Sequence, residues 1–249
     1  MEDKEILEMG IADTIIEKPI GFIVDEQHFY IYPVTLGKTY ILARLLRSLE
    51  TNEKGLVSNP YMEALRLCTG KKDVVCRILA YYTFNRKEEL FDNVQIDDRV
   101  NLFVDKLDLE ELVTLFTLVL SSDNTEEYIK YFGIDKERQE RTRIASVKKD
   151  NSSITFGGRS IYGTMIDFAC QRYGWTMNHL LWEISYANLK MLMADAITTI
   201  YLSEEERKLL GKSVGEVING DDPINRELVR EMIRAVSYTH LTLPTILRV

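Results

Sequence analysis

The chain has 249 residues, of which 45% are hydrophobic and 28% are charged, and its formal net charge is −8 at pH 7. This composition is ordinary for a globular protein with one large or two small domains. The acidic balance argues against nucleic acid or an anionic membrane as a partner, and no apolar run approaches the roughly 20 residues of a membrane span. Because Met1-Glu-Asp-Lys-Glu also lacks the pattern of a signal peptide, we expect a cytoplasmic protein whose cysteines are reduced.

The first predicted elements are the two strands of a short hairpin. Residues Gly21–Val24 and His28–Tyr32 contain the β-branched and aromatic side chains that favour strands, and they flank Asp25-Glu26-Gln27, which suits a turn. A helix is expected next, because apolar residues then recur three and four positions apart, the spacing of one helix face. The residues of this face are Ile41, Leu42, Leu45, Leu46 and Leu49.

More helices are predicted from their start and stop signals. Pro60 suits the first turn of a helix, and Gly70 separates that helix from the next one. Asp108-x-x-Glu111 resembles a capping box and opens a helix with an apolar face. Gly133 closes a short helix over Glu126–Phe132.

The apolar signal then fades over residues 135–153, where charged side chains of both signs alternate. This pattern predicts a solvated helix that runs into a linker. We therefore divide the chain into an N-terminal hairpin and helical domain (1–134), a charged linker (135–153) and a C-terminal helical domain (154–235). The expected fold class is mainly α with a small N-terminal β-hairpin, in two helical parts.

The second part opens with the densest aromatic and apolar block of the sequence, Ser160–Asp195, which contains both tryptophans. One helix face is predicted over Tyr162–Tyr173, and Gly174 suits a helix stop because it adopts positive φ without strain. Thr176 is a candidate N-cap for the following helix.

A third helix is predicted from Ser185 to Tyr201, where apolar residues go most of the way round. A helix that is apolar on every side is central to a domain or covered by a partner. A capping box at Ser203-x-x-Glu206 and the pair Asp222-Pro223 predict two later helices.

The aromatic residues of this block have two interpretations, which their spacing does not separate. They form a hydrophobic core, or some of them stay partly exposed and bind another protein, for which Trp and Tyr are well suited. The candidate partner-binding residues are Tyr162, Tyr173, Trp175, Trp182 and Tyr186. The sequence shows no nucleophile–base pair, metal-ligand spacing or glycine-rich phosphate loop, so we expect a non-enzymatic protein with no cofactor.

Short motifs in this order resemble bacteriophage tail assembly chaperones, in particular those of gut phages and prophages. The motifs are YGWT (173–176), an aromatic-containing apolar helix, the Ser–Tyr–Ala–Asn–Leu break (185–189) and a Leu/Met-rich helix. The N-terminal half is compatible, with its hairpin, a helix entered through Pro33-Val-Thr-Leu-Gly and a helical pair that ends in Tyr-Phe-Gly-Ile. The resemblance covers most of residues 19–202.

Tail assembly chaperones are encoded just ahead of the tape-measure protein of long-tailed phages. The resemblance implies a protein that binds the tape-measure protein, keeps it soluble, helps to recruit tail-tube protein and then leaves. The alternative is a structural tail or neck component that is retained in the virion. Whether the chain associates with itself is left open.

The C-terminal segment is treated separately from the fold. Val236–Thr245 resembles the translation of a transposase adapter that is used to prepare sequencing libraries. We therefore interpret residues 236–249 as an adapter artefact and leave them out of the fold prediction.

Overall fold

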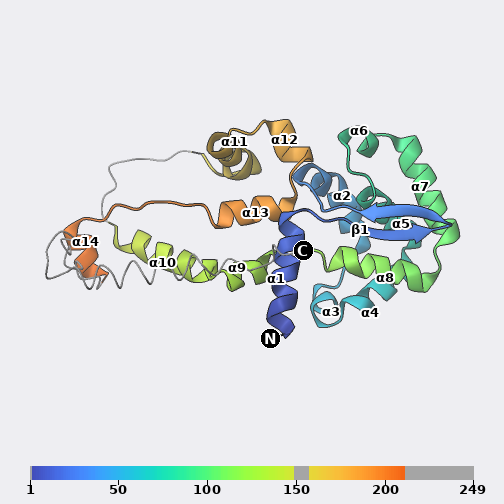
Figure 1. Ribbon diagram of the computed structural model, residues 1–249, viewed down its shortest axis with the longest axis horizontal. Coiled ribbons are helices and arrows are strands. Elements are labelled where there is room, and N and C mark those ends of the chain that lie inside the picture. The colour runs from blue at the N-terminus through green and yellow to red at the C-terminus, as the bar shows by residue number, and fades with distance from the viewer. Residues whose placement is uncertain (1, 149–156, 211–249) are drawn as a thin grey trace, which may run out of the picture. The chain divides into compact units, whose positions relative to one another are not determined.

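The computed structural model describes residues 2–148 and 157–210 (Figure 1). The strands are β1 (Ile20–Val24) and β2 (Gln27–Ile31). The helices of the first described stretch are α1 (Glu2–Ile15), which precedes the hairpin, and then α2 (Leu36–Leu49), α3 (Glu53–Ser58), α4 (Pro60–Gly70), α5 (Lys72–Tyr82), α6 (Lys87–Leu90), α7 (Asn93–Lys106), α8 (Leu109–Leu120), α9 (Thr125–Tyr131) and α10 (Ile134–Val147). After these come the π-helical turn η1 (Tyr162–Ile166), α11 (Asp167–Tyr173), α12 (Met177–Trp182), α13 (Tyr186–Ala194) and α14 (Glu204–Leu209). The predicted fold class, mainly α with a small β-hairpin near the N-terminus, is confirmed.

The chain forms two compact units, whose limits differ from the domains predicted from the sequence. The first unit consists of Met1–Gln139 and Ser153–Thr198, and the second of Glu140–Ser152 and Thr199–Val249. The aromatic block therefore belongs with the N-terminal elements and not to a separate domain over 154–235. The physical reason is the packing of α12 on α2, which the next subsection describes.

The hairpin owes its register to a two-residue turn. Asp25 and Glu26 both have positive φ, 49° and 64°, the backbone pattern whose twist matches two antiparallel strands. This turn pairs Val24 with Gln27 and Phe22 with Phe29, so that Gln27, expected in the turn, lies in β2. The Phe22 and Phe29 rings lie 5.9 Å and 5.4 Å from the ring of Phe103 on α7. Alternation along the strands thus turns one face of the hairpin to the helices.

The core of the first unit lies between the hairpin and helices α4, α5, α7 and α8. In it α4 packs against α8, α5 packs against α7, and β2 contacts α5 (Figure 1). Leu67, Ile78, Phe103 and Phe116, one from each of these helices, are at most 1% exposed. Burying a side chain of this size stabilises the fold by about 1.5–3 kcal/mol.

Most of the predicted helix ends are present. The capping box at Asp108 is closed by hydrogen bonds in both directions between Asp108 and Glu111. Gly174 ends α11 with φ 67°, and the Thr176 hydroxyl accepts a hydrogen bond from the His179 backbone N–H as the N-cap of α12. These predictions are confirmed. The sequence could predict the caps because capping depends on near neighbours in the chain.

The predicted helix from Ser185 to Tyr201 is wrong in its C-terminal half. Helix α13 ends at Ala194, and residues 196–203 are not helical. Asp195 and the paired threonines at 198 and 199 are weaker helix formers than the Leu and Met residues before them, which accounts for the early stop. Ile197 and Tyr201 are 84% and 83% exposed, so they do not belong to a buried helix.

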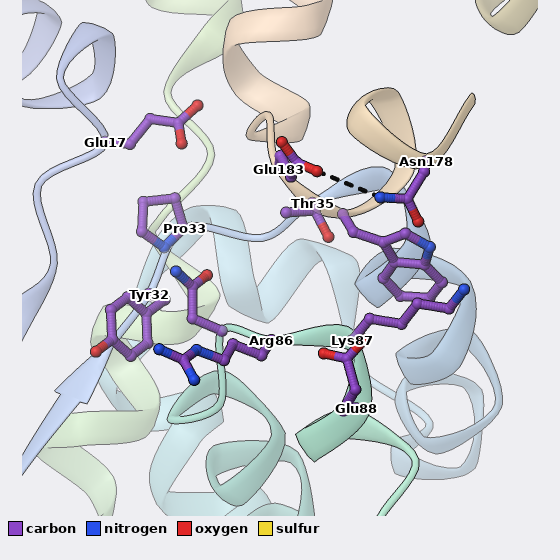
Figure 2. A pocket seen from close by; sticks show the side chains of 11 residues that line it. Glu17, Tyr32, Pro33, Thr35, Arg86, Lys87, Glu88, Asn178 and Glu183 are labelled. Atoms are coloured by element: carbon purple, nitrogen blue, oxygen red, sulfur yellow. Dashed lines mark hydrogen bonds between the residues drawn. The ribbon is translucent and has the colours of Figure 1, made fainter. Parts of the chain in front are cut away.

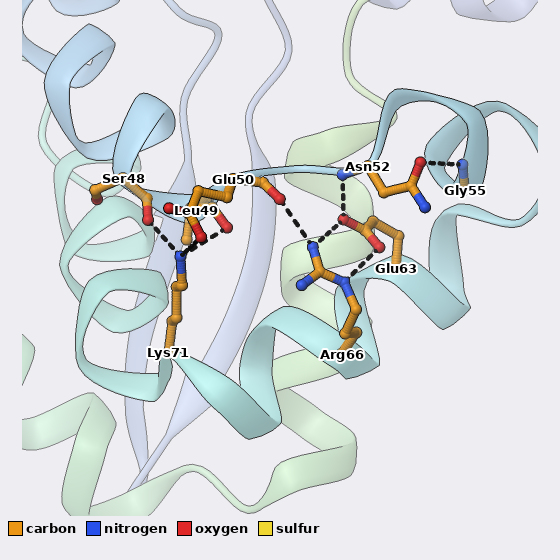
Figure 3. A network of polar contacts seen from close by, with 8 residues as sticks. All are labelled: Ser48, Leu49, Glu50, Asn52, Gly55, Glu63, Arg66 and Lys71. Carbon is orange, nitrogen blue, oxygen red and sulfur yellow. Dashed lines mark hydrogen bonds and ion pairs between the residues drawn. The ribbon is translucent and has the colours of Figure 1, made fainter.

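A buried carboxylate ties the loop before α3 to α4 (Figure 3). Glu63 accepts hydrogen bonds from Arg66 at 2.6 Å and 2.9 Å and from the Asn52 backbone N–H at 2.7 Å. The bonds from Arg66, together with the bond from Asn52, lower the pKa of Glu63 to about 2 against the opposing effect of burial. The carboxylate is therefore charged at neutral pH.

The C-terminus of α2 is held by Lys71 in the same region (Figure 3). Its ammonium donates to the carbonyl oxygens of Ser48 at 2.6 Å and Leu49 at 3.1 Å. These carbonyls belong to the last turn of the helix, where a cation is favourable. The helix ends at its C-cap Glu50, whose φ of 52° lies in the left-handed region.

The described part of the second unit contains the end of α10 and helix α14. The predicted capping box is confirmed, since the Ser203 backbone N–H donates to Glu206 at 2.8 Å and the Ser203 hydroxyl accepts from the Glu206 N–H at 3.3 Å. Arg143 of α10 donates to the Leu210 carbonyl at 3.1 Å. The helix predicted after Asp222-Pro223 and the proposed adapter segment 236–249 lie outside the described residues.

Candidate protein-binding site

Helix α12 docks on the first turn of α2, at a position where only glycine fits. A Cβ atom on Gly37 would lie 2.6 Å from Cζ3 of Trp182 and 2.8 Å from the carbonyl oxygen of Leu181. Such distances are too short for any side chain, so the indole ring lies directly on the α2 backbone. The close approach brings the aromatic block against the N-terminal elements.

Hydrogen bonds fix the loop between α12 and α13 to the segment that precedes α2. The backbones of Thr35 and Ser185 form an isolated antiparallel bridge, and the Tyr186 N–H donates to the Val34 carbonyl at 2.7 Å. The Glu17 carboxylate accepts a 2.7 Å bond from the Ser185 N–H. Thr35 and Ser185 are 5% and 1% exposed, so these polar groups are buried and paired. Such an arrangement holds Trp182 in one place.

An open pocket of about 400 Å³ lies beside Trp182 (Figure 2). Its walls come from four parts of the first unit: Glu17 before the hairpin, the segment after the hairpin, the segment around α6, and α12 with its C-cap. The lining residues are Glu17, Tyr32, Pro33, Thr35, Asn85, Arg86, Lys87, Glu88, Asn178, Trp182 and Glu183. Most of these side chains are polar or charged, and the indole of Trp182 is the largest apolar surface among them.

The charged side chains of the pocket differ in whether they already have partners. Glu183 accepts hydrogen bonds from Asn178 at 3.3 Å and from His179 at 2.7 Å, and Figure 2 shows the first of these at the rim. Arg86 and Lys87 form no ion pair with any part of the chain that the structure describes. Lys87 instead places its ammonium 5.7 Å from the centroid of the Trp182 ring.

The structure places the five candidate partner-binding residues in different surroundings. Trp182 is half-buried against the main core, and its ring meets Phe91 edge-on at 5.8 Å. The rings of Tyr173 and Trp175 lie 4.8 Å apart. These two and Tyr186 pack around a second buried cluster, whose centre is Leu36, Ala169, Leu180 and Leu189.

Tyr162 is the only one of the five that is largely solvent-exposed, with 65% of its surface accessible. It lies in η1, one turn before α11. Tyr173, by contrast, donates a hydrogen bond from its hydroxyl to the Leu192 carbonyl at 3.2 Å, which anchors α11 to α13. Both interpretations of the aromatic block therefore describe some of its members, and whether any of the five binds a partner stays a prediction.

Sequence reasoning missed three residues around Trp182. Phe91 is 60% exposed although it contacts the indole, and Arg86 and Lys87 line the pocket. The only signal in the sequence is their order: two basic residues and an aromatic residue within one short segment. Nothing in that order indicates that α12 lies next to them, because the pocket joins segments far apart in the chain.

The described residues hold no group of three or more His, Cys, Asp or Glu side chains that is placed to bind a metal ion. Among them there is also no helix with the length and apolar character needed to span a bilayer. Comparisons with protein families, curated proteins and solved structures gave no match to the chain.

Proposed function

We propose that this chain is a non-enzymatic phage tail assembly chaperone of the bacterial cytoplasm. In this role it binds the tape-measure protein, keeps it soluble and helps the assembly of tail-tube protein. The proposal rests first on the resemblance of most of residues 19–202 to such chaperones. The alternative is a structural tail or neck component that stays in the virion.

The observation that supports protein binding most directly is the aromatic pair Trp182 and Phe91 beside an open pocket. Phe91 is 60% exposed, and its ring meets that of Trp182, which packs on the α2 backbone at Gly37. An aromatic side chain that is already held in place contributes large contact area with little loss of conformational freedom on binding. A long helical protein with exposed apolar faces, as proposed for the tape-measure protein, associates wrongly unless another protein covers those faces.

The test is co-expression of the chain with the tape-measure protein encoded beside its own gene. The chain is expected to raise the soluble fraction of the tape-measure protein and to be recovered with it in a pull-down. Phe91→Ala is the sharpest variant, because an exposed ring can be removed without leaving a core cavity. It should weaken binding by about 2 kcal/mol, roughly thirtyfold, with an unchanged melting temperature.

Val57→Ala is the matched control, since Val57 is 88% exposed on α3 and does not line the pocket. This variant should bind like the unchanged protein. Trp182→Ala is a poor probe because the ring packs on the core, and its loss should destabilise the fold by about 3–5 kcal/mol. Recovery of the chain in purified particles, with no binding to the tape-measure protein, would replace the chaperone with the structural component.

A further inference from the structure

The pocket beside Trp182 has a chemical character that identifies what it would hold. We infer that it binds a segment of the partner protein in which a carboxylate lies close to an apolar or aromatic side chain. The carboxylate contacts Arg86 and Lys87, and the apolar side chain packs on Trp182 and Phe91. This inference rests on the proposed protein-binding function and adds the chemistry of the segment that is recognised.

The cations carry the first part of the inference. Arg86 and Lys87 are adjacent, both line the pocket and both are exposed. In Figure 2 the Arg86 side chain extends toward Tyr32. The Lys87 ammonium lies 5.7 Å from the centroid of the Trp182 ring. Neither forms an ion pair with a described residue, whereas Arg66 and Arg77 are each paired with a carboxylate. A planar guanidinium and an ammonium side by side suit a carboxylate.

Two of the three acidic side chains of the pocket already accept hydrogen bonds from within the chain, so they are less available than the two cations to an occupant. Glu17 accepts hydrogen bonds from the Ser185 N–H and from the Asn188 amide at 3.0 Å. Glu183 is held by Asn178 and His179. Both bonds to Glu17 end on Oε1, whereas Glu183 uses both of its oxygens. The whole lining therefore holds three carboxylates and two cations, and the two cations lie together on the segment around α6 with Glu88. A carboxylate of the occupant is expected at this side of the pocket, where two positive charges stand beside one negative charge.

The aromatic pair explains why the occupant also needs an apolar group. The two rings meet edge-on at 5.8 Å, and Phe91 is 60% exposed. An apolar side chain that packs here removes this surface from water and shields the nearby charge contact, which strengthens it.

The experiment uses the full chain with ¹⁵N-labelled tryptophan, which gives two indole N–H signals, one from Trp175 and one from Trp182. The signals are assigned with Trp175→Phe, which serves for assignment alone. The probes are three synthetic helical peptides with the same Leu and Phe positions, whose remaining variable positions are all Glu, all Gln or all Lys. The Glu peptide should shift the Trp182 signal and bind about fivefold more tightly than the Gln peptide, the size expected of two exposed charge pairs.

The double variant Arg86→Gln with Lys87→Gln should abolish the difference between the Glu and Gln peptides and leave the melting temperature unchanged. Arg44→Gln with Arg47→Gln is the control of equal charge, because both residues are exposed on α2 and outside the pocket lining. That control should keep the fivefold preference, which separates a local contact from an effect of net charge.

Three results would overturn the inference: tighter binding of the Lys peptide, a shift of the Trp175 signal alone, or a Glu preference that survives the Arg86 and Lys87 replacements. If tape-measure protein binds while the Trp182 signal stays fixed with every peptide, the proposed function stands and this pocket is not its site. If the Glu preference holds while tape-measure protein fails to bind, the pocket chemistry stands and the chaperone proposal falls.

Discussion

Lys38 is an unusual residue for a protein core. It lies in the first turn of α2 with 1% of its surface exposed, and its ammonium has no hydrogen-bond partner in the described chain. Burial lowers the pKa of Lys38 from 10.5 to about 8, and the negative charge of Glu89 opposes this only in part. Because Lys38 follows Gly37, the buried ammonium belongs to the turn of α2 that contacts α12.

The contribution of Lys38 to stability should therefore rise with pH above about 8. Above about pH 9 the buried thiols of Cys68 and Cys76 act in the opposite direction, because burial raises their pKa values. Below about pH 8 Lys38 is charged in both states, so the folded state carries the full cost of a buried charge. Between pH 8 and 10.5 the folded state loses this proton before the unfolded state does, and the contribution of Lys38 to the free energy of unfolding increases. The difference between the two pKa values corresponds to about 3 kcal/mol at most.

We predict that Lys38→Met raises the free energy of unfolding at pH 7 by up to about 3 kcal/mol and removes the rise that Lys38 causes between about pH 8 and 9. Lys54→Met is the control, because Lys54 is exposed on α3 and its replacement should change neither quantity. Denaturant unfolding at several pH values measures both effects. A Lys38→Met variant less stable than the unchanged protein at pH 7 would show that the ammonium has a partner.

At the scale of elements, the sequence predicts what near neighbours decide. The hairpin, the cap at Thr176 and the stop at Gly174 depend on residues a few positions apart, and each is found. Helix α1 was not predicted, since its apolar residues do not form one clear face, and Ile6 and Met9 are more than 60% exposed. The pocket was not predicted either, because Trp182 meets Phe91 only through the docking of α12 on α2.

The docking of α12 makes Gly37 a sharp test of that packing. Gly37→Ala should destabilise the fold, because a Cβ there meets the indole and a backbone carbonyl at less than 3 Å. Overpacking of this kind costs about 1–3 kcal/mol, against a gain in helix propensity of at most about 1 kcal/mol. The fluorescence of Trp182 should change as the ring is displaced.

Gly70→Ala is the matched replacement, since Gly70 ends α4 and an added Cβ there has no heavy atom within 4 Å. It should leave stability unchanged or raise it by up to about 1 kcal/mol. Thermal melts of the two variants give the comparison. If Gly37→Ala is as stable as Gly70→Ala, α12 does not rest on α2 as described.

At the scale of the molecule, residues 157–198 complete the first unit and do not stand beside it. Leu36 of α2 is buried in one cluster with Leu180 and Leu189. The loop at Ser185 is bonded to the segment before α2, and Lys190 pairs with Asp123 at 2.6 Å. The sequence showed a fading apolar signal over 135–153 and so predicted a linker, but it held no information on where the chain returns. That return depends on contacts such as those of Ser185 with Glu17 and of Lys190 with Asp123, which join residues 168 and 67 positions apart.

This arrangement predicts that the chain stays together when it is cut between its predicted domains. A specific protease site is inserted after Lys149, and the cleaved protein is passed over a size-exclusion column under native conditions. The two fragments should elute together and separate only in denaturant, because each large apolar side chain buried between them contributes about 1.5–3 kcal/mol. Trp182→Ala in the same cleavable chain should weaken the association of the two fragments. If the fragments of the unchanged protein separate and each keeps its helical signal and a cooperative melt, residues 154–235 would be an independent domain, as the sequence alone indicates.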